Sequence, residues 1–300
     1  MGNLHWGIDL GGTKIECAVL EDDTDKVHFR ERIPTEQEGG YRHILDQINK
    51  LVQIAIKETG SKPEKIGLGA PGTIDYDSGK IKNSNTVCLN DMQLKGDLEK
   101  LIKVPLILSN DANCFALAET TMGIVKDLDI KANVVFGIIM GTGVGGGIVV
   151  HNKVIDGRHG IAGEWGHNYL DPSGGECYCG KKGCVETIIS GPALEKYYNQ
   201  LTGKNYPLPE IVKKQSSDVH AMATINRLHR MFGKAVANVI NILDPDVIIL
   251  GGGLGNITSL IDDGVKEILP HLFNPVLHTK IVKPKLGDSA GVFGAAMLAK

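Results

Sequence analysis

The sequence predicts an α/β protein built from two related lobes, and three observations support this prediction. Short apolar runs alternate with segments in which apolar residues recur at helical spacing. A pattern of strand, glycine turn and strand occurs near the N-terminus and again after residue 134. The length of 300 residues is enough for two lobes with cores of their own.

The first lobe begins with an apolar strand, a glycine turn and a second strand. Residues 6–10 are apolar apart from Asp9, the run breaks at Gly11-Gly12-Thr13, and residues 15–20 resume it. The elements expected next are a helix at about 41–58, a strand over 65–72, a helix and then a strand over 97–111, and a helix from Asp111 to Thr121. Either Asn110 or Asp111 is expected near the N-cap of that last helix.

The opening pattern returns in the second half of the chain. Residues 134–140 are apolar, the glycines of 141–147 interrupt them, and 148–150 resume. The two segments share a design rather than an alignable sequence, which suggests two related lobes. The remaining expected elements are helices at about 221–243, 257–269 and 289–299, and a strand running into a glycine turn over 247–255.

The bulk composition excludes several classes of protein. A formal net charge of -3 gives no electrostatic case for binding nucleic acid or an anionic membrane. The sequence contains no run of eighteen apolar residues, so we expect no membrane span. The first residues lack a basic segment followed by an apolar one, so we expect no secretory signal and a cytoplasmic location.

One histidine and three cysteines stand close together among glycines between Glu164 and Glu186. His167, Cys177, Cys179 and Cys184 form the ligand set of a closed, four-coordinate zinc site, which we expect to be structural because no position is left for water. The glycines that allow the loop to fold back are Gly174, Gly175, Gly180 and Gly183. The other cysteines, Cys17, Cys88 and Cys114, have apolar neighbours and are interpreted as buried free thiols.

Three glycine turns raise the question of phosphate binding: residues 10–14, 141–147 and 251–255. Glycines let backbone N–H groups approach phosphate oxygens, although a single turn of this kind is most often a hairpin. The sequence has no G-x-x-x-x-G-K-[ST]. G-x-G-x-x-G occurs as GLGAPG and GTGVGG, but neither is followed by the helix that a dinucleotide site requires.

Side chains around the turns fit phosphate and magnesium chemistry. Asp9 could hold Mg²⁺ through water, because a hard cation prefers oxygen ligands. Thr13, Thr142 and the backbone at Gly11 and Gly12 could hold phosphates. Lys14 lies next to them and is either a phosphate contact or a solvated surface lysine.

The motifs resemble those of ROK-family sugar kinases from one end of the chain to the other. DLGGTK, GAPG, NDANCFALAE, GTGVGGGIV, AGEWGHN, CYCGKKGCVE, DPDVIILGGGL and GDSAGVFGAA follow the order found in that family. The resemblance implies an actin/hexokinase-type, ribonuclease H-like fold that binds ATP and a sugar in a cleft between its lobes. Residues 1–115 with 289–300 would form the N-terminal lobe, and 116–288 the C-terminal lobe with the zinc module 164–186. Some members carry an N-terminal DNA-binding domain, which we do not expect here because Asp9 lies so near the start of the sequence.

The resemblance also implies roles for single residues. Asp111 matches the catalytic base, although its position alone favours a helix cap. The expected sugar contacts are Gly72, Asn85, Asn110, Asp111, Glu164, His167 and Glu186. The expected ATP and Mg²⁺ contacts are Asp9, Gly11, Gly12, Thr13, Lys14, Thr142, Gly143, Gly252 and Gly253, the last two before a helix N-terminus that favours anions. One ring nitrogen of His167 would bind zinc and the other would face the sugar or a glutamate.

The motifs specify the sugar less well. AGEWGHN, CYCGKKGCVET and GDSAGV resemble the fructokinase, mannokinase and glucokinase group, so phosphorylation of fructose, mannose or glucose on the 6-hydroxyl ranks first. N-acetylglucosamine or N-acetylmannosamine ranks second, and a sugar-sensing regulator without activity third. By the same resemblance we expect a homodimer, and a cleft that closes on the sugar to exclude water.

Overall fold

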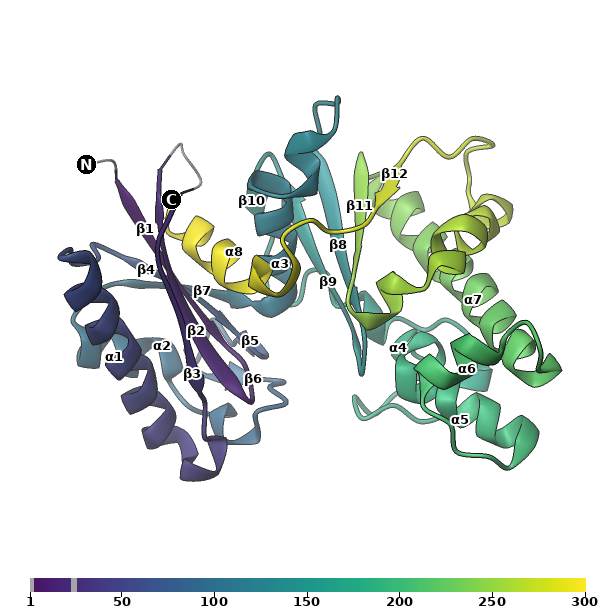
Figure 1. The fold of residues 1–300 in the computed structure, drawn as a ribbon, viewed down its shortest axis with the longest axis horizontal. Helices are drawn as coiled ribbons and strands as arrows, with labels where there is room; N and C mark the ends of the chain where they lie inside the picture. Colours follow the sequence, from purple (N-terminus) through teal and green to yellow (C-terminus); the bar gives the residue numbers. More distant parts are fainter. Residues whose placement is uncertain (1–2, 23–25) are drawn as a thin grey trace. The chain divides into compact units, whose positions relative to one another are not determined.

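The computed structural model describes residues 3–22 and 26–300. The chain divides into two compact units, the first made of Met1–Ile130, Gly147–Ala162 and Lys285–Lys300, the second of Lys131–Gly146 and Gly163–Pro284 (Figure 1). Compared with the expected lobes, the first unit also takes in residues 116–130, 147–162 and 285–288. Within the described residues, no helix is both long and apolar enough to cross a membrane.

The first unit contains a five-stranded sheet in the order β3-β2-β1-β4-β7. Its strands are β1 (Leu4–Leu10), β2 (Lys14–Glu21), β3 (Val27–Pro34), β4 (Ile66–Ala70) and β7 (Leu106–Asn110). The first three are antiparallel, and β4 and β7 continue the sheet in parallel. β3 was not predicted from the sequence, because this edge strand is mostly polar and buries only Phe29.

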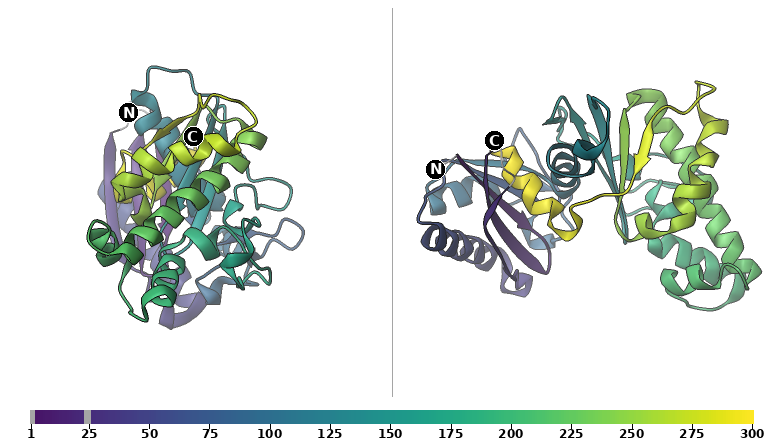
Figure 2. Two further views of the ribbon diagram at one scale, coloured as in Figure 1. Left: turned by 90° about the vertical axis from the view of Figure 1, so that its right-hand side faces the viewer. Right: turned by 45° about the horizontal axis from the view of Figure 1, so that its top comes forward.

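Helices cover both faces of the first sheet. The helices are α1 (Gly40–Thr59), α2 (Leu94–Ile102), α3 (Asp111–Thr121) and α8 (Ala290–Leu298). Trp6 and Ile8 of β1 share a core with α1 and α2, while α3 and α8 lie on the opposite side (Figure 1). Gly7 allows α8 to lie against β1, since a Cβ added there would stand 2.3 Å from the Ala296 nitrogen. Figure 2 (right) shows α8 as the yellow helix beside the purple strands.

A second five-stranded sheet has the order β10-β9-β8-β11-β12. Its strands are β8 (Val134–Met140), β9 (Val144–Val150), β10 (Lys153–Val154), β11 (Val247–Gly251) and β12 (Lys280–Val282). The strand order and directions repeat those of the first sheet, as the repeated sequence pattern predicted. The expected start of β9 at residue 148 is wrong: the strand begins at Val144, so the glycine turn is short and three glycines continue into the strand.

The second unit is completed by helices α4 (Glu186–Ile189), α5 (Gly191–Thr202), α6 (Leu208–Lys214) and α7 (Val219–Leu243). The expected helix at 257–269 is wrong as a regular α-helix. The segment forms a π-helix over Leu260–Gly264 and a 3-10 helix over Lys266–His271. Gly264 has a low helix propensity and Pro270 has no backbone N–H, so both disfavour a continuous α-helix here.

Candidate active site and metal centre

The β1–β2 turn of the first unit carries Gly11, Gly12 and Thr13, and Thr35 braces it. The Gly11 N–H donates to the Lys14 carbonyl at 2.9 Å. The Thr35 hydroxyl donates to the Gly11 carbonyl at 2.6 Å, and the Thr35 N–H to the Thr13 carbonyl at 3.0 Å. Thr35 is fully buried. Sequence reasoning missed it because it follows β3, the strand that was not predicted.

Asp9 points its carboxylate between the end of β1 and the start of α8. A Cβ added at Gly291 would lie 2.6 Å from Asp9 Oδ2, so only glycine leaves room there. Burial raises the pKa of Asp9 to about 7, and the negative charges of Asp111 and Glu16 act in the same direction. A cation beside these carboxylates would relieve their repulsion, which suits a hard ion such as Mg²⁺.

Asp111 is the first residue of α3, and it is not the helix cap. Asn110 takes the N-cap position, where its side-chain oxygen accepts from the Asn113 N–H at 2.7 Å. The Asp111 carboxylate accepts from the adjacent Ala112 N–H at 2.8 Å and from its own backbone N–H. Surrounding protein atoms raise its pKa through desolvation, although the residue still reaches solvent. The Asp111 carboxylate is therefore available for chemistry, while Asn110 has its side-chain NH₂ left for a ligand.

Gly72 and the loop that carries Asn85 lie together on the first unit. Gly72 has φ +83°, and a Cβ added there would stand 2.5 Å from the Lys82 carbonyl. Asn90 holds the loop by accepting from the Ser84 N–H and donating to the Ser84 carbonyl, both at 2.9 Å. Asn85 itself is exposed. The two expected sugar contacts are thus neighbours on a fixed loop.

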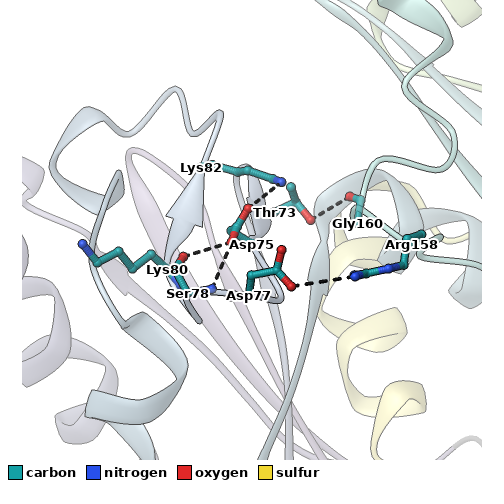
Figure 3. Close-up of polar contacts among 8 residues, drawn as sticks. All are labelled: Thr73, Asp75, Asp77, Ser78, Lys80, Lys82, Arg158 and Gly160. Carbon is teal, nitrogen blue, oxygen red and sulfur yellow. Dashed lines mark hydrogen bonds and ion pairs between the residues drawn. The ribbon is translucent and has the colours of Figure 1, made fainter.

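The small hairpin of β5 (Thr73–Ile74) and β6 (Ile81–Lys82) supports this loop (Figure 3). The Thr73 hydroxyl donates to the Gly160 carbonyl at 2.7 Å, which ties the hairpin to the segment after β10. Hydrogen bonds from Ser78 and Lys82 lower the pKa of Asp75 to about 2. Figure 3 also shows the ion pair of Arg158 with Asp77 at 3.8 Å.

The β8–β9 turn of the second unit is held by Glu186 and by the start of α5. The Val144 N–H donates to Glu186 Oε2 at 2.9 Å. Inside the turn, the Gly141 N–H donates to the Gly143 carbonyl, and the Gly191 N–H donates to the Gly141 carbonyl, both at 2.9 Å. Glu186, an expected sugar contact, therefore touches the turn that carries two expected nucleotide contacts, Thr142 and Gly143.

Gly252 brings the end of β11 against the end of β8. A Cβ added at Gly252 would lie 2.2 Å from the Met140 carbonyl, whereas one added at Gly253 would meet nothing within 4 Å. The expected regular α-helix N-terminus after these glycines is wrong, because a four-residue 3-10 helix, Gly253–Asn256, follows them directly and the next helical segment becomes a π-helix at Leu260–Gly264. Any contact with a nucleotide here would be made by the backbone, and the open space beside Gly253 would leave room for the ligand.

Glu164 precedes a short 3-10 helix, Trp165–His167, and His167 is its last residue; Trp165 connects this helix to β9. The Trp165 indole donates to the Gly145 carbonyl at 2.9 Å, and its ring packs edge-on against Phe136 at 5.9 Å. Glu164 and His167 are both half-buried. The buried tryptophan thus fixes the two polar side chains next to β9.

His167, Cys177, Cys179 and Cys184 come together as a candidate metal centre, with all ligand atoms within 4.8 Å of one another. Cys177 Sγ lies 3.5 Å from His167 Nδ1, and Cys179 Sγ lies 3.7 Å from Cys184 Sγ. Zinc at its usual distances of about 2.3 Å from sulfur and 2.0–2.1 Å from nitrogen would require tetrahedral edges of about 3.6 Å for S–N and 3.8 Å for S–S. The donor set fits zinc. Gly175, Gly180 and Gly183 adopt positive φ in the loop, and Gly174 does not.

Tyr178 is a residue of this region that sequence reasoning missed. Its hydroxyl lies 2.9 Å from His167 Nε2, the two rings pack edge to face at 5.0 Å, and the side chain is 80% exposed. The Tyr178 hydroxyl, and not a glutamate, thus lies against His167 Nε2, and the expected contact of His167 with a sugar stays a prediction. The only feature of the sequence that could have indicated this role is the position of Tyr178 between two candidate metal ligands, Cys177 and Cys179.

The cysteines outside the candidate metal centre are free thiols in the described part of the chain. Cys17 and Cys114 are buried as expected, and Cys88 is only partly buried.

The family can now be assigned. The model of the ROK family matches residues 5–300. The chain belongs to the ROK family. The family inferred from the motifs is confirmed, as is the class of enzyme, a ROK-family phosphotransferase.

Relatives and solved structures agree with this assignment along the whole chain. The N-acetyl-D-glucosamine kinase of Yersinia enterocolitica is 34% identical, with 98% of this chain and 99% of the relative covered. The ROK hexokinase from Thermus thermophilus has a TM-score of 0.88 at 30% identity, covering 99% of this chain and 98% of its own. A ROK glucokinase from Streptomyces griseus, in complex with glucose and AMPPNP, has a TM-score of 0.77 at 29% identity, with 99% of both chains covered.

The expected sugar needs a correction. Fructose, mannose or glucose ranked first from the motifs, but further curated relatives at 33–38% identity are also named N-acetyl-D-glucosamine kinase. The ranking of unmodified hexoses is therefore wrong, and the alternative is better supported. The physical reason is that the motifs were assigned to phosphates of ATP and to ring hydroxyls, which kinases of all these sugars must bind, and no residue was assigned to the 2-position.

Proposed function

We propose that this chain is an ATP-dependent N-acetyl-D-glucosamine kinase that phosphorylates the sugar on its 6-hydroxyl. The observation that carries the proposal is the full-length similarity to kinases of that name. The position of Asp111 at the start of α3 agrees with the proposal, because its carboxylate does not cap the helix and phosphoryl transfer to a hydroxyl needs a group that accepts the proton.

Asp111 would act as the general base. Its carboxylate has no cation or capping partner among the described residues that would hold it away from a substrate hydroxyl. A raised pKa brings a carboxylate closer to the operating pH, where general-base catalysis is most effective. Such catalysis typically contributes about 10²–10⁴-fold in rate.

The three glycine turns would hold the phosphates. Gly11, Gly12, Thr13 and Lys14 would contribute from the first unit, and Thr142, Gly143, Gly252 and Gly253 from the second. Asp9 would hold Mg²⁺ through water, and the ion would neutralise charge on the phosphates. The pair of carboxylates with raised pKa, Asp9 and Asp111, supports a cation at this place.

The sugar hydroxyls would be bound by carboxylates and amides. We assign this role to Gly72, Asn85 and Asn110 on the first unit and to Glu164 and Glu186 on the second. His167 would act by binding zinc. The Tyr178 hydroxyl, which lies against His167 Nε2, would offer the sugar the hydrogen bond that was expected from the histidine ring. Zinc at His167, Cys177, Cys179 and Cys184 would be structural, because four protein ligands leave no position for a nucleophilic water.

A coupled ATPase assay tests the proposal directly. The sugars are N-acetylglucosamine, N-acetylmannosamine, glucose, mannose and fructose, each at the same range of concentrations with Mg²⁺ and ATP. We expect the highest kcat/KM with N-acetylglucosamine. A higher value with another sugar would overturn the substrate, and turnover of none would point to a sugar-sensing regulator.

A further inference from the structure

The carboxylate of Glu186 faces two ways. Oε2 accepts from the Val144 N–H at 2.9 Å, at the point where the glycine turn passes into β9. No hydrogen bond to Oε1 is present within residues 3–22 and 26–300, and the side chain is half-buried at the start of α4. One oxygen is therefore used inside the protein and the other is available to a ligand.

The turn depends on this contact because few other groups hold it. Its outer residues are fixed by the Gly191 N–H and by the short bond from the Gly141 N–H to the Gly143 carbonyl. The Val144 N–H is the donor next to Gly143, and a charged acceptor makes a stronger hydrogen bond than a neutral one. Where Glu186 places its carboxylate thus affects where the Gly143 and Val144 backbone lies.

We infer that Glu186 is a positioning residue for the nucleotide turn as well as a sugar ligand, so that sugar and nucleotide bind cooperatively. The inference rests on the proposed function, which assigns the sugar to Glu186 and the phosphates to the turn. A sugar that engages Oε1 restrains the carboxylate, and the restrained carboxylate restrains Val144 and Gly143. By reciprocity, a nucleotide that orders the turn tightens sugar binding by the same factor.

Two alanine substitutions in the turn separate this contact from simple crowding. In Gly143→Ala the new methyl would stand 2.7 Å from Glu186 Oε2, so the end of that flexible side chain must move away from Val144. In Gly141→Ala the new methyl would meet nothing within 4 Å. Neither glycine has a positive φ, so backbone strain does not distinguish the two variants.

Titration calorimetry of the zinc-loaded protein provides the test. We expect the wild type to bind N-acetylglucosamine about tenfold more tightly in the presence of Mg²⁺ and AMPPNP than without them. Gly143→Ala should weaken sugar binding about tenfold in the absence of any nucleotide and abolish the cooperativity. Gly141→Ala should bind the sugar alone as the wild type does. Equal zinc content and melting temperature in both variants show that the fold is intact.

Substitutions of Glu186 separate its two roles. Glu186→Gln keeps an oxygen that can accept from Val144, so AMPPNP affinity without sugar should stay within about twofold while sugar affinity falls. Glu186→Ala should lower both affinities. The positioning role is overturned if Glu186→Ala leaves AMPPNP affinity unchanged, or if Gly143→Ala and Gly141→Ala bind the sugar equally. A wild type that binds another hexose instead of N-acetylglucosamine overturns only the substrate, and the same titrations then use that hexose.

Discussion

The β1–β2 turn and the β8–β9 turn occupy the same place in two sheets of the same strand order, and different side chains serve them. Asp9 pairs with Gly69 of the parallel neighbour β4, just as Ile139 pairs with Gly251 of β11. The first turn thus has a carboxylate where the second has an apolar residue. Conversely, the second turn is held by the Glu186 carboxylate and the first by the neutral Thr35 hydroxyl.

The difference shows how one backbone frame can serve two purposes. Both turns close with a short bond from the first glycine N–H, to Lys14 in one case and to Gly143 in the other. The Asp9 carboxylate lies on the strand itself and is placed to bind a cation. The Glu186 carboxylate comes from α4 and is placed to couple the turn to a bound sugar. Function is assigned by the side chains that reach each turn, and the four predictions below test that assignment in order of expected size.

The largest effect should follow loss of the metal centre, which lies in the same unit as the β8–β9 turn. Cys179→Ser should lose most of its zinc, because a structural site contributes on the order of 10 kcal/mol to local folding. Hydrogen exchange should then rise across residues 164–186 and stay unchanged in β1 and β2. Metal analysis and exchange mass spectrometry measure both, with Cys88→Ser as the control that keeps its zinc. Full zinc occupancy in Cys179→Ser would refute the ligand set.

Removal of the proposed base should abolish chemistry and leave the fold intact. Asp111→Ala should lower kcat by about 10²–10⁴-fold, the usual contribution of a general base. Zinc content and melting temperature should match those of the wild type, because the N-cap of α3 is Asn110. Asp46→Ala, on the exposed side of α1, is the matched control. Activity of Asp111→Ala within a few-fold of the control would exclude the assignment.

The carboxylate of the first turn should make stability depend on pH. The pKa of Asp9 is about 7 in the folded protein and about 3.9 in the unfolded chain, so the folded state binds more protons between these values. The free energy of unfolding should therefore fall as pH rises from about 4 to 7. Asp9→Asn cannot ionise at this position, so its free energy of unfolding should exceed that of the wild type by about 2 kcal/mol above pH 7. This value is half of the free energy that corresponds to the whole pKa difference, because solvent partly reaches the carboxyl group.

Urea unfolding of both proteins at pH 4 to 8 without Mg²⁺ measures this difference. The two curves should converge toward pH 4, where Asp9 is protonated in the folded state and about half protonated in the unfolded chain. A difference that stays constant with pH would mean that Asp9 titrates normally.

The smallest effect should come from the neutral brace of the first turn. Thr35→Val removes the hydroxyl that donates to the Gly11 carbonyl and should cost about 1 kcal/mol, seen as a roughly five-fold higher KM for ATP. Thr35→Ser keeps the donor and should restore the KM. An unchanged KM in Thr35→Val would show that the first turn needs no brace, unlike the second.

Local patterns in the sequence were sufficient for much of the fold and for part of the site. The four candidate metal ligands lie close together in the sequence, so their spacing alone predicted that they meet. Helices such as α1 and α7 were predicted because their apolar faces are regular. The edge strand β3 was missed because an edge strand can be mostly polar, and the segment after Ile257 was assigned a helix that Pro270 disfavours.

Contacts between distant segments could not be predicted in this way. The bond from Val144 to Glu186 joins residues 42 positions apart, and its partners are chosen by packing of the whole unit. Thr35 was missed for the same reason. The sugar was ranked wrongly because the motifs were interpreted as contacts to phosphates and ring hydroxyls, and the residues around the 2-position could not be placed from the sequence.

The position of α8 under the first sheet has a consequence for biosynthesis. The helix is made last, yet it covers one face of β1, which is made first. At about 5–20 residues per second, the ribosome finishes all of the second unit before the first can bury that face. We therefore expect the N-terminal sheet to stay incomplete, and to be the segment that chaperones bind, until translation ends. Ribosome-bound chains that expose only residues up to Pro284 should protect the second unit from protease and leave the first sensitive, and protection of both would contradict this order.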